Sequence, residues 1–340
     1  MSSDSVGQRL RSARKLAGLT QVQLGMRAHV STSLVTKVEA GSVPASAAMV
    51  AGCAQGLGIA AADLYGTRES AEPVAASPAA GIPELRSALD AYDDPRPTGE
   101  PLGLAEARRR VREAGDRASA LRYAAAGRDL PGLLRHLYVL SDTSPAARSV
   151  LHDAYRLAAT VAGRYGHSDL AAVASERHIA LAPLTDDPLR VAISAFHRSS
   201  AHLNHGTFDA GLRLLERAYD DVVADSDTAR AVQAQLLLRA AVLAARSGDL
   251  SRGDEYLSEA RELAHRYRLP PFPYYNVDVS TLNMEVHWCA LPVEVYDSAE
   301  SIRRAELTPI QHGNRPERVA HHHFDQARAW LLHGNRDRVL

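Results

Sequence analysis

Residues 19–41 read LTQVQLGMRAHVSTSLVTKVEAG, and this stretch decides how the N-terminal part of the chain folds. Thr20 is followed three residues later by Gln23, which is the spacing of a capping box at the start of a helix. Ser31 is placed to cap a second helix, and Gly41 is placed to end it. The stretch therefore predicts two short helices joined by a tight turn.

The second of these helices has distinct inner and outer sides. Val35 and Val38 lie three positions apart and share one face, which we expect to be buried. The positions left on the outer side are polar and short or flexible: Thr32, Ser33, Thr36 and Lys37. A helix of this kind fits the major groove of DNA, where its first exposed side chains contact base edges.

Further short helices are expected on both sides of this stretch. Upstream, apolar residues recur at helical spacing until Gly18 supplies a stop. Downstream, a helix is expected near residues 46–57, and a short final turn ends at Leu64. The sequence thus predicts a compact domain of five helices in residues 1–66.

This domain resembles the phage-repressor-like (XRE) helix-turn-helix family over most of its length. The residues that carry the resemblance are Leu19, Thr20, Gln21, Leu24, Ala28, Val30, Ser31, Val35, Val38, Glu39, Gly41, Leu57, Gly58, Ile59, Asp63 and Leu64. The resemblance implies that double-stranded DNA is the partner and that the third helix enters the major groove. It also implies that Gln21 and the adjacent backbone amides hold a phosphate, and helix N-termini suit anions in any case.

The chain departs from the family pattern at three places, one of which is the segment from Gly41 to Leu57, one residue longer than the common pattern. His29 stands where the family usually has glycine or asparagine, and we expect the turn to survive because histidine tolerates a left-handed backbone. Thr32 and Ser33 are shorter than the arginine or glutamine that often reads bases there, so direct readout is expected to be modest. Candidates for additional phosphate contacts, which a solvated helix face explains equally well, are Arg11, Arg14 and Lys15. The alternative for the whole domain is a five-helix dimerisation module without a DNA role.

Composition limits the class of protein. The 340 residues carry a formal net charge of −1, and 46% hydrophobic residues exclude wholesale disorder. Residues 1–66 hold six basic and three acidic groups, which gives a net charge of +3 and leaves −4 for the rest of the chain. A basic N-terminal domain suits a polyanionic partner. Cys53 and Cys289 alone cannot form a disulfide framework or a four-cysteine zinc site. A cytoplasmic protein without a membrane span is expected, because the start lacks a hydrophobic signal core and no apolar run reaches ~20 residues.

Residues 67–101 change in composition and are expected to form a connector. Alanine, proline, serine, glycine and glutamate dominate residues 67–83, which is typical of a flexible linker. A short helix is expected to begin at Ile82 and to run through Leu89 and Tyr92.

Residues 102–340 have a helical pattern almost throughout, with a recurring turn signal. The expected turns lie 39 to 44 residues apart, at residues 127–129, 166–169, 206–209 and 248–250, with weaker signals at 290–292 and 334–337. Each interval holds two helical stretches, and a helical hairpin cannot bury its apolar faces alone. Stacked hairpins are therefore predicted. The last helix lacks a partner in this scheme, so either it packs elsewhere or the natural chain continues.

The two expected hairpins around Gly206 and Gly248 are similar to tetratricopeptide repeats. Small residues occupy the positions at which helices of that family cross closely: Ser199, Gly211, Ala218, Ala241, Gly253 and Ala260. The spacing exceeds the usual repeat of about 34 residues, so the resemblance implies variants with long helices, and an unrelated irregular helical array is the alternative. A repressor-like head on a tetratricopeptide-like body resembles the peptide-sensing regulators of Gram-positive bacteria.

Stacked hairpins present their first helices on a concave surface. The polar residues expected there are candidate effector-binding residues: Arg156, Arg164, Ser200, Asn204, Gln235, Arg246 and Arg328. Arginine and amide side chains suit a peptide backbone or a carboxylate. Ordinary solvated surface is the alternative for each of them.

The sequence shows no sign of catalysis. It contains no phosphate-cradling glycine loop and no HExxH, CxxC or GxSxG motif, so we expect neither an enzyme nor a bound cofactor. His321, His322 and His323 are adjacent on a helix and diverge by about 100° each, which disfavours a metal site. The sequence predicts an all-α, DNA-binding transcription regulator, expected to be a homodimer, whose body senses a peptide or a small molecule. The alternative is a docking scaffold whose head localises it and whose recruited partner protein regulates it.

Overall fold

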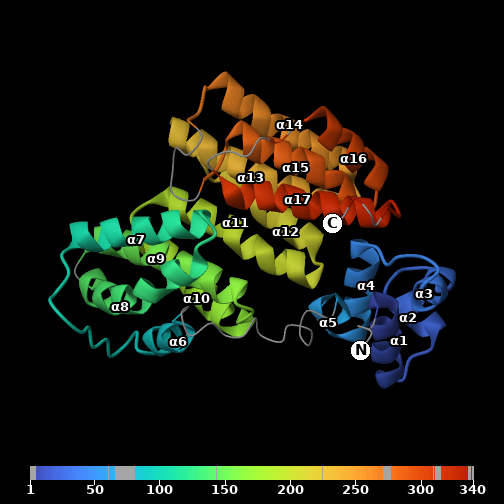
Figure 1. Cartoon of the computed structure of the whole chain (residues 1–340), viewed down its shortest axis with the longest axis horizontal. Helices are drawn as coiled ribbons and strands as arrows, with labels where there is room; N and C mark the ends of the chain where they lie inside the picture. The colour runs from blue at the N-terminus through green and yellow to red at the C-terminus, as the bar shows by residue number, and fades with distance from the viewer. Residues whose placement is uncertain are drawn as a thin grey trace.

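The computed structural model describes residues 5–59, 61–65, 81–142, 144–223, 225–270, 277–308, 310, 315–335 and 338. Within this described part of the chain every regular element is a helix, so the expected all-α fold is confirmed. Most of the predicted connector falls in residues 66–80, which lie outside the described residues. Figure 1 shows a small N-terminal bundle, called the head below, beside a larger body of paired helices.

The head, residues 5–65, contains the five expected helices: α1 (Val6–Leu16), α2 (Gln21–Arg27), α3 (Thr32–Glu39), α4 (Ala47–Leu57) and α5 (Ala61–Tyr65). Both halves of the predicted capping box are present at the start of α2. The Thr20 side chain accepts a hydrogen bond from the Gln23 backbone N–H, and the Gln23 side chain accepts one from the Thr20 backbone N–H. His29 takes the left-handed conformation, with a φ of 56°. Local signals in the sequence thus set the geometry of α2, the turn and α3.

The core of the head holds α3 from its inner side. Val35 and Val38 are 0% and 2% exposed, as expected, and they pack in one cluster with Leu10 and Leu24. Burying one such aliphatic side chain stabilises a fold by about 1.5–3 kcal/mol, so a few of them fix α3 firmly. Cys53 lies in the same core, and burial raises the pKa of its thiol to about 11.

The short helix predicted inside the connector packs with the body instead. This helix is α6 (Ile82–Asp90), and Ile82, Leu85 and Leu89 are buried in the core that α6 shares with α8. Its apolar residues lie along one face, and a short amphipathic helix is stable only when that face is covered. Residues 82–90 are therefore part of the body and not of the connector.

The described part of the body consists of α6, stacked helical hairpins and one last helix. The described hairpins are α7 (Leu104–Ser119) with α8 (Tyr123–Ser141), α9 (Pro145–Arg164) with α10 (Ser168–Leu181), α11 (Pro188–His205) with α12 (Phe208–Asp220), α13 (Asp227–Arg246) with α14 (Leu250–Arg266), and α15 (Thr281–Glu294) with α16 (Ser298–Leu307). A 3₁₀ turn, η2 (Ala182–Leu184), continues α10. The last helix, α17 (Pro316–Leu332), packs against α15 and α16.

Three of the predicted hairpin turns are confirmed and two are wrong. Gly166, Gly206 and Gly248 have φ values of 80°, 72° and 100° and separate paired helices. Helix α8 runs without a break through residues 127–129, and α15 runs through residues 290–292. The turns that belong to those two hairpins lie elsewhere.

Leu121 and Tyr296 make the two turns that were misplaced, with φ values of 60° and 65°. In both, the N–H of the turn residue bonds to the carbonyl three residues back, and the next N–H bonds to the carbonyl five residues back. Glycine makes the same helix-ending pattern at Gly166 and Gly248. Since bulky residues rarely adopt this backbone conformation, a search that relies on glycine cannot locate these turns.

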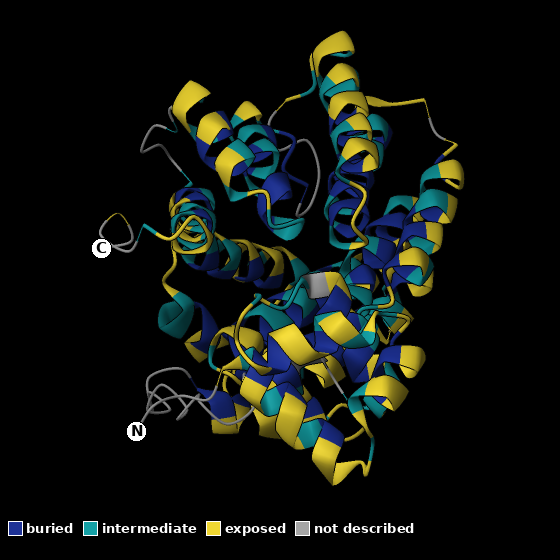
Figure 2. Ribbon diagram, turned by 90° about the vertical axis from the view of Figure 1, so that its right-hand side faces the viewer, coloured by how far each residue is buried: buried dark blue, intermediate teal, exposed yellow. Residues whose placement is uncertain are grey.

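The small residues of the tetratricopeptide-like pattern lie at close helix crossings. A methyl group added to Gly211 would press against His202 and Leu243, and one added to Gly253 would press against the Ala241 carbonyl. Figure 2 shows the buried positions on the inward sides of the paired helices and the exposed positions on their outer sides. Both crossings belong to the apolar core across α11–α15, and a second apolar core lies across α6–α10.

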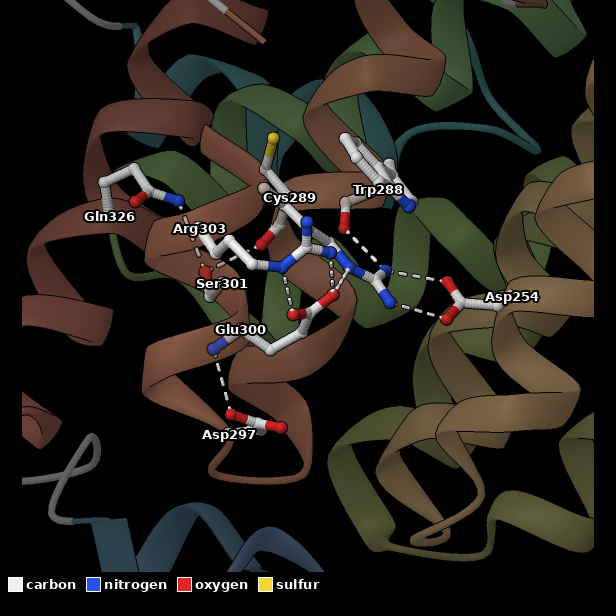
Figure 3. Close-up of polar contacts among 9 residues, drawn as sticks. Asp254, Trp288, Cys289, Asp297, Glu300, Ser301, Arg303 and Gln326 are labelled. Atoms are coloured by element: carbon white, nitrogen blue, oxygen red, sulfur yellow. Dashed lines mark hydrogen bonds and ion pairs between the residues drawn. The ribbon is translucent and has the colours of Figure 1, made fainter. Parts of the chain in front are cut away.

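A buried arginine fixes the α15–α16 hairpin to its neighbour. The Arg304 guanidinium donates two hydrogen bonds to Asp254 of α14 at 2.7 and 2.6 Å, one to Glu300 at 2.8 Å and one to the Trp288 carbonyl at 3.1 Å. Figure 3 shows Asp254, Trp288 and Glu300 converging on this point. The clamp positions the α15–α16 turn, and Tyr296 of that turn contacts the head.

Candidate nucleic-acid interface

The outer face of α3 is open to solvent in the folded chain. Ser33, Thr36 and Lys37 are exposed and Thr32 is partly buried. Helix α3 lies on the side of the head that faces away from the body (Figure 1). The four positions predicted to contact bases therefore share one accessible side.

Gln21, the predicted phosphate-binding residue, is part of a hydrogen-bond chain between α2 and α3. Its Nε2 donates to Glu39 Oε2 at 2.9 Å, and its Oε1 accepts from the Thr36 hydroxyl at 3.0 Å. Glu39 in turn accepts from Arg14 Nε and Nη2 at 2.6 and 2.8 Å. These bonds fix the Gln21 side chain next to Thr36 at the surface of α3.

The charges in this chain of bonds reinforce one another. Burial by itself would raise the pKa of Glu39, but the hydrogen bonds from Arg14 and Gln21 outweigh burial and lower it. The hydrogen bond to Glu39 raises the pKa of Arg14. Arg14 is therefore a buried structural cation, which corrects the suggestion that it contacts phosphate, whereas Arg11 and Lys15 are exposed.

A different side of the head, formed by α4 and α5, contacts the body. The Tyr296 hydroxyl donates to the backbone carbonyl of Ala45, immediately before α4. Burial raises the pKa of Tyr296 to about 12, so the phenol keeps the proton that it donates. Ala51 of α4 lies so close to Gly206 that a methyl group added to Gly206 would overlap it.

A buried ion-pair cluster lies beside this contact. Glu294 is only 8% exposed in its side chain and pairs with Arg246 at 2.8 Å and with Arg328 at 3.1 Å. Burial opposes ionisation of Glu294, but the two arginines prevail and lower its pKa. All three charges act on Tyr65 at the end of α5. Arg246 and Arg328, predicted as effector-binding residues, therefore lie next to the head.

A groove with a volume of about 1380 Å³ runs along the inner side of the body. Its walls come from α7, α9, α11, α13 and α17 and from residues 277–278. Eight arginines and four carboxylates line it: Arg108, Arg112, Arg156, Arg164, Arg190, Arg239, Arg315 and Arg318 against Asp116, Asp153, Asp278 and Glu317. The excess of cations favours an anionic ligand.

The other predicted effector-binding residues divide between the groove and its surroundings. Arg156, Arg164 and Ser200 line the groove. Gln235 is 2% exposed, and its Oε1 accepts from the Asp278 backbone N–H at 3.0 Å, so it holds the segment that lines the groove. Asn204 is exposed on α11 outside the groove lining.

Arg239 is a groove residue that the sequence analysis did not select. It lies four positions after Gln235 and seven before Arg246 on α13, so all three share one side of the helix. That spacing is the signal that would have found it. Arg318 was also missed, although it lies on α17 with the predicted Arg328, because long-range packing decides which side of α17 lines the groove.

The three adjacent histidines point in different directions, as expected. His321 lines the groove, His322 is buried and His323 is exposed. In the described part of the chain, no group of three or more histidine, cysteine or acidic side chains is arranged to hold a metal ion. None of the described helices combines the length and apolar character that a bilayer crossing requires.

Comparisons with known proteins bear mainly on the head. Residues 5–65 match a family model described as a helix-turn-helix domain. No curated protein matches the chain. A solved structure described as Bacillus thuringiensis PlcR in complex with the peptide PapR7 and DNA is 13% identical to this chain, with 99% of each chain covered and a TM-score of 0.31. Residues 5–65 therefore form a helix-turn-helix domain, and it is followed by a body of helical repeats.

Proposed function

We propose that the chain is a transcription regulator that binds double-stranded DNA with α3 in the major groove. Thr32, Ser33, Thr36 and Lys37 contact bases or phosphates, and Gln21 holds a phosphate at the N-terminus of α2. The observation that carries the proposal is the exposure of the outer face of α3 while α4 and α5 contact the body. We assign no catalytic step and no cofactor to the chain.

We propose further that the regulator acts as a homodimer. Residues 1–66 have a net charge of only +3, so one head forms few phosphate contacts. Two heads placed on a pseudo-palindrome, with half-sites about one helical turn apart, double those contacts and explain how such a weakly charged domain binds a specific site.

The groove is the proposed site for a peptide or small-molecule effector. Three helices that line it also reach the contact between head and body. The pairs of residues, with the groove residue first, are Ser200 and Gly206 along α11, Arg239 and Arg246 along α13, and Arg318 and Arg328 along α17. A ligand that favours one arrangement of these helices thereby shifts the surface on which the head rests, and with it the position of α3.

The DNA-binding proposal is tested by selecting duplexes from a random-sequence pool with the full chain. We expect enrichment of a two-fold symmetric sequence, and a binding constant that falls linearly with salt on logarithmic axes. Failure to enrich any sequence, together with salt-independent or absent binding, would contradict the proposal. Capture of a stable folded partner protein by the body, without any ligand in the groove, would favour the docking scaffold instead.

A further inference from the structure

Arg239 occupies an unusual position in the groove. Its guanidinium carbon lies 4.2 Å from the centre of the Phe196 ring, so the aromatic face covers one side of it. The residue is partly buried and reaches the groove surface. Among the described residues, no carboxylate forms an ion pair or a hydrogen bond with Arg239.

Other cations surround this guanidinium. Burial first, and then repulsion by Arg318 and Arg246, lowers the pKa of Arg239 to about 10. The same pattern appears at His287, where burial and the charges of Arg318 and Arg239 lower the pKa to about 4. Burial and several neighbouring cations, Arg239 among them, also hold the pKa of His197 well below its ordinary value. The region around Arg239 thus concentrates positive charge in a poorly solvated place.

Other arginines of the same groove have carboxylate partners. Arg190 pairs with Asp153, Arg164 with Glu317 at 3.3 Å, and Arg318 with Asp278 at 3.4 Å. These pairs occupy three of the four carboxylates in the groove lining, and the fourth, Asp116, is exposed on α7. Arg108 and Arg112 of the groove are exposed to water, whereas Arg239 is a partly buried cation for which the described chain supplies no carboxylate partner.

Buried charges in folded proteins are normally paired, because the loss of hydration must be offset by an opposite charge. We propose that Arg239 is the anchor of an anion-binding site in the groove, and that the ligand of the body carries a carboxylate or a phosphate group that pairs with it. This inference rests on the proposed effector groove and names the chemistry of its ligand. The Phe196 ring covers one face of the guanidinium, so the anion approaches its edge, where N–H groups bind two oxygens side by side.

The size of the groove indicates that the anionic group is one end of a larger ligand. A volume of about 1380 Å³ greatly exceeds what a single carboxylate or phosphate fills. Ser200 of α11 and Thr160 and Arg156 of α9 line the same groove. The Ser200 hydroxyl and the Arg156 guanidinium carry hydrogen-bond donors for the remainder of the ligand.

The site is tested on the full chain without DNA, using succinate and inorganic phosphate as probes. Thermal unfolding and calorimetry are measured with each probe against sodium chloride at constant ionic strength, because a bound ligand stabilises the folded chain. We expect at least one probe to raise the melting temperature, and the preferred probe identifies the anion as a carboxylate or a phosphate. Arg239→Met, which retains an apolar chain over Phe196, should weaken that binding by about 10- to 100-fold.

Two control variants make the result specific. Arg213→Gln removes an exposed arginine of α12 outside the groove lining and should leave binding of the probe unchanged. Without any probe, Arg239→Met should be at least as stable as the wild type, because it removes an unpaired charge, whereas a purely structural arginine would leave a less stable variant. Arg239→Lys keeps the positive charge but cannot form the bidentate hydrogen bonds of a guanidinium, so this variant should bind the probe with intermediate affinity.

The outcomes separate this inference from the DNA-binding proposal. The anion-site inference is overturned if neither probe binds the wild type, or if Arg239→Met responds to the probe as the wild type does. Lys37→Ala, at the DNA-facing side of the head, should retain the full response to the probe. A chain that binds the probe but selects no DNA would uphold the anion site and refute only the regulator.

Discussion

The Tyr296 hydroxyl donates a hydrogen bond to the backbone carbonyl of Ala45, although 251 positions separate the two residues in the chain. This bond joins the turn between α15 and α16 to the start of α4. Together with the contact between Ala51 and Gly206, it holds the head by α4 and α5 and leaves α3 facing outward. The head therefore presents separate sides to the body and to the proposed DNA.

The tight contact at Gly206 gives a direct test of this docking. Gly206→Ala should displace the head, because the new methyl group overlaps Ala51 and the φ of 72° also strains alanine. Spin labels on Ser12→Cys of α1 and Arg213→Cys of α12 report the distance between head and body. The native Cys53 and Cys289 are buried and should not react with the label.

Gly166→Ala is the matched control for this substitution. It has a similar φ of 80°, so the backbone cost of about 1–2 kcal/mol is shared, but nothing lies near the added methyl group. The control should lose stability without a change in the distance between the labels. An equal distance change in both variants would refute the docking arrangement.

Tyr296→Phe tests the hydrogen bond itself. Removing the hydroxyl should weaken the head–body contact by about 0.5–1.5 kcal/mol, because the Ala45 carbonyl loses its partner. Hydrogen exchange of the α4 and α5 amides should become faster, while exchange in the α13–α14 hairpin stays unchanged. Tyr92→Phe, at an exposed tyrosine of the body, serves as the control and should alter neither.

The local structure of the head follows closely from its sequence. The capping box at Thr20 and the cap at Ser31 are short-range signals, and the inward valines follow from helix periodicity. The buried pair of Arg14 and Glu39 could not be read in this way. Arg14 lies four positions after Leu10 on the buried side of α1, but its partner is 25 positions away, and periodicity does not identify it.

In the body, prediction succeeded where glycine makes the turn and failed where Leu121 and Tyr296 make it. The predicted effector-binding residues show the same limit. Arg156 follows from position within a hairpin, but Arg246 lies in an ion-pair cluster because α15 supplies Glu294 from a distant part of the chain. Helix periodicity identifies a face, and only the packing of other helices determines what that face contacts.

The Arg14–Glu39 pair predicts a pH dependence for the head. The pKa of Glu39 is lowered in the folded state, so its contribution is complete above the ordinary pKa of 4.5 and is lost as the pH falls through the lower folded value. Glu39→Gln should therefore destabilise the head at neutral pH by about 3–5 kcal/mol, because it leaves the Arg14 guanidinium buried without a counter-charge. Below pH 4.5 the difference between variant and wild type should shrink.

Hydrogen exchange of the α1 and α3 amides between pH 3 and pH 7 measures this difference. The control is Glu106→Gln, which removes an exposed carboxylate paired with Arg109 and Arg110 on α7. Exposed pairs contribute little, so this variant should leave the stability of the head unchanged. A Glu39→Gln difference that is the same at all pH values would show that the carboxylate charge is not what stabilises the head.

Lys37→Ala should weaken binding to the selected duplex without unfolding the head, because the side chain is exposed on the outer face of α3. A good base contact contributes about 1–3 kcal/mol, whereas a phosphate contact reduces the salt slope by about one unit. Anisotropy measured over a range of salt concentrations separates the two roles. Arg108→Ala removes one positive charge from the body and should leave both the affinity and the slope unchanged.

Gln21→Ala should also weaken DNA binding, and the structure gives it two ways to act. The variant loses a side chain at the N-terminus of α2, and it removes one of the two acceptors of the Thr36 hydroxyl, leaving the Thr32 carbonyl as the other. If orientation of Thr36 matters, Gln21→Ala and Thr36→Val should together cost less than the sum of their separate effects on binding. Gln55→Ala, at an exposed glutamine of α4, is the control and should bind as the wild type does. Additive effects would mean that Gln21 acts on the phosphate alone, and unchanged affinity in both Gln21→Ala and Lys37→Ala would remove α2 and α3 as the DNA-binding surface.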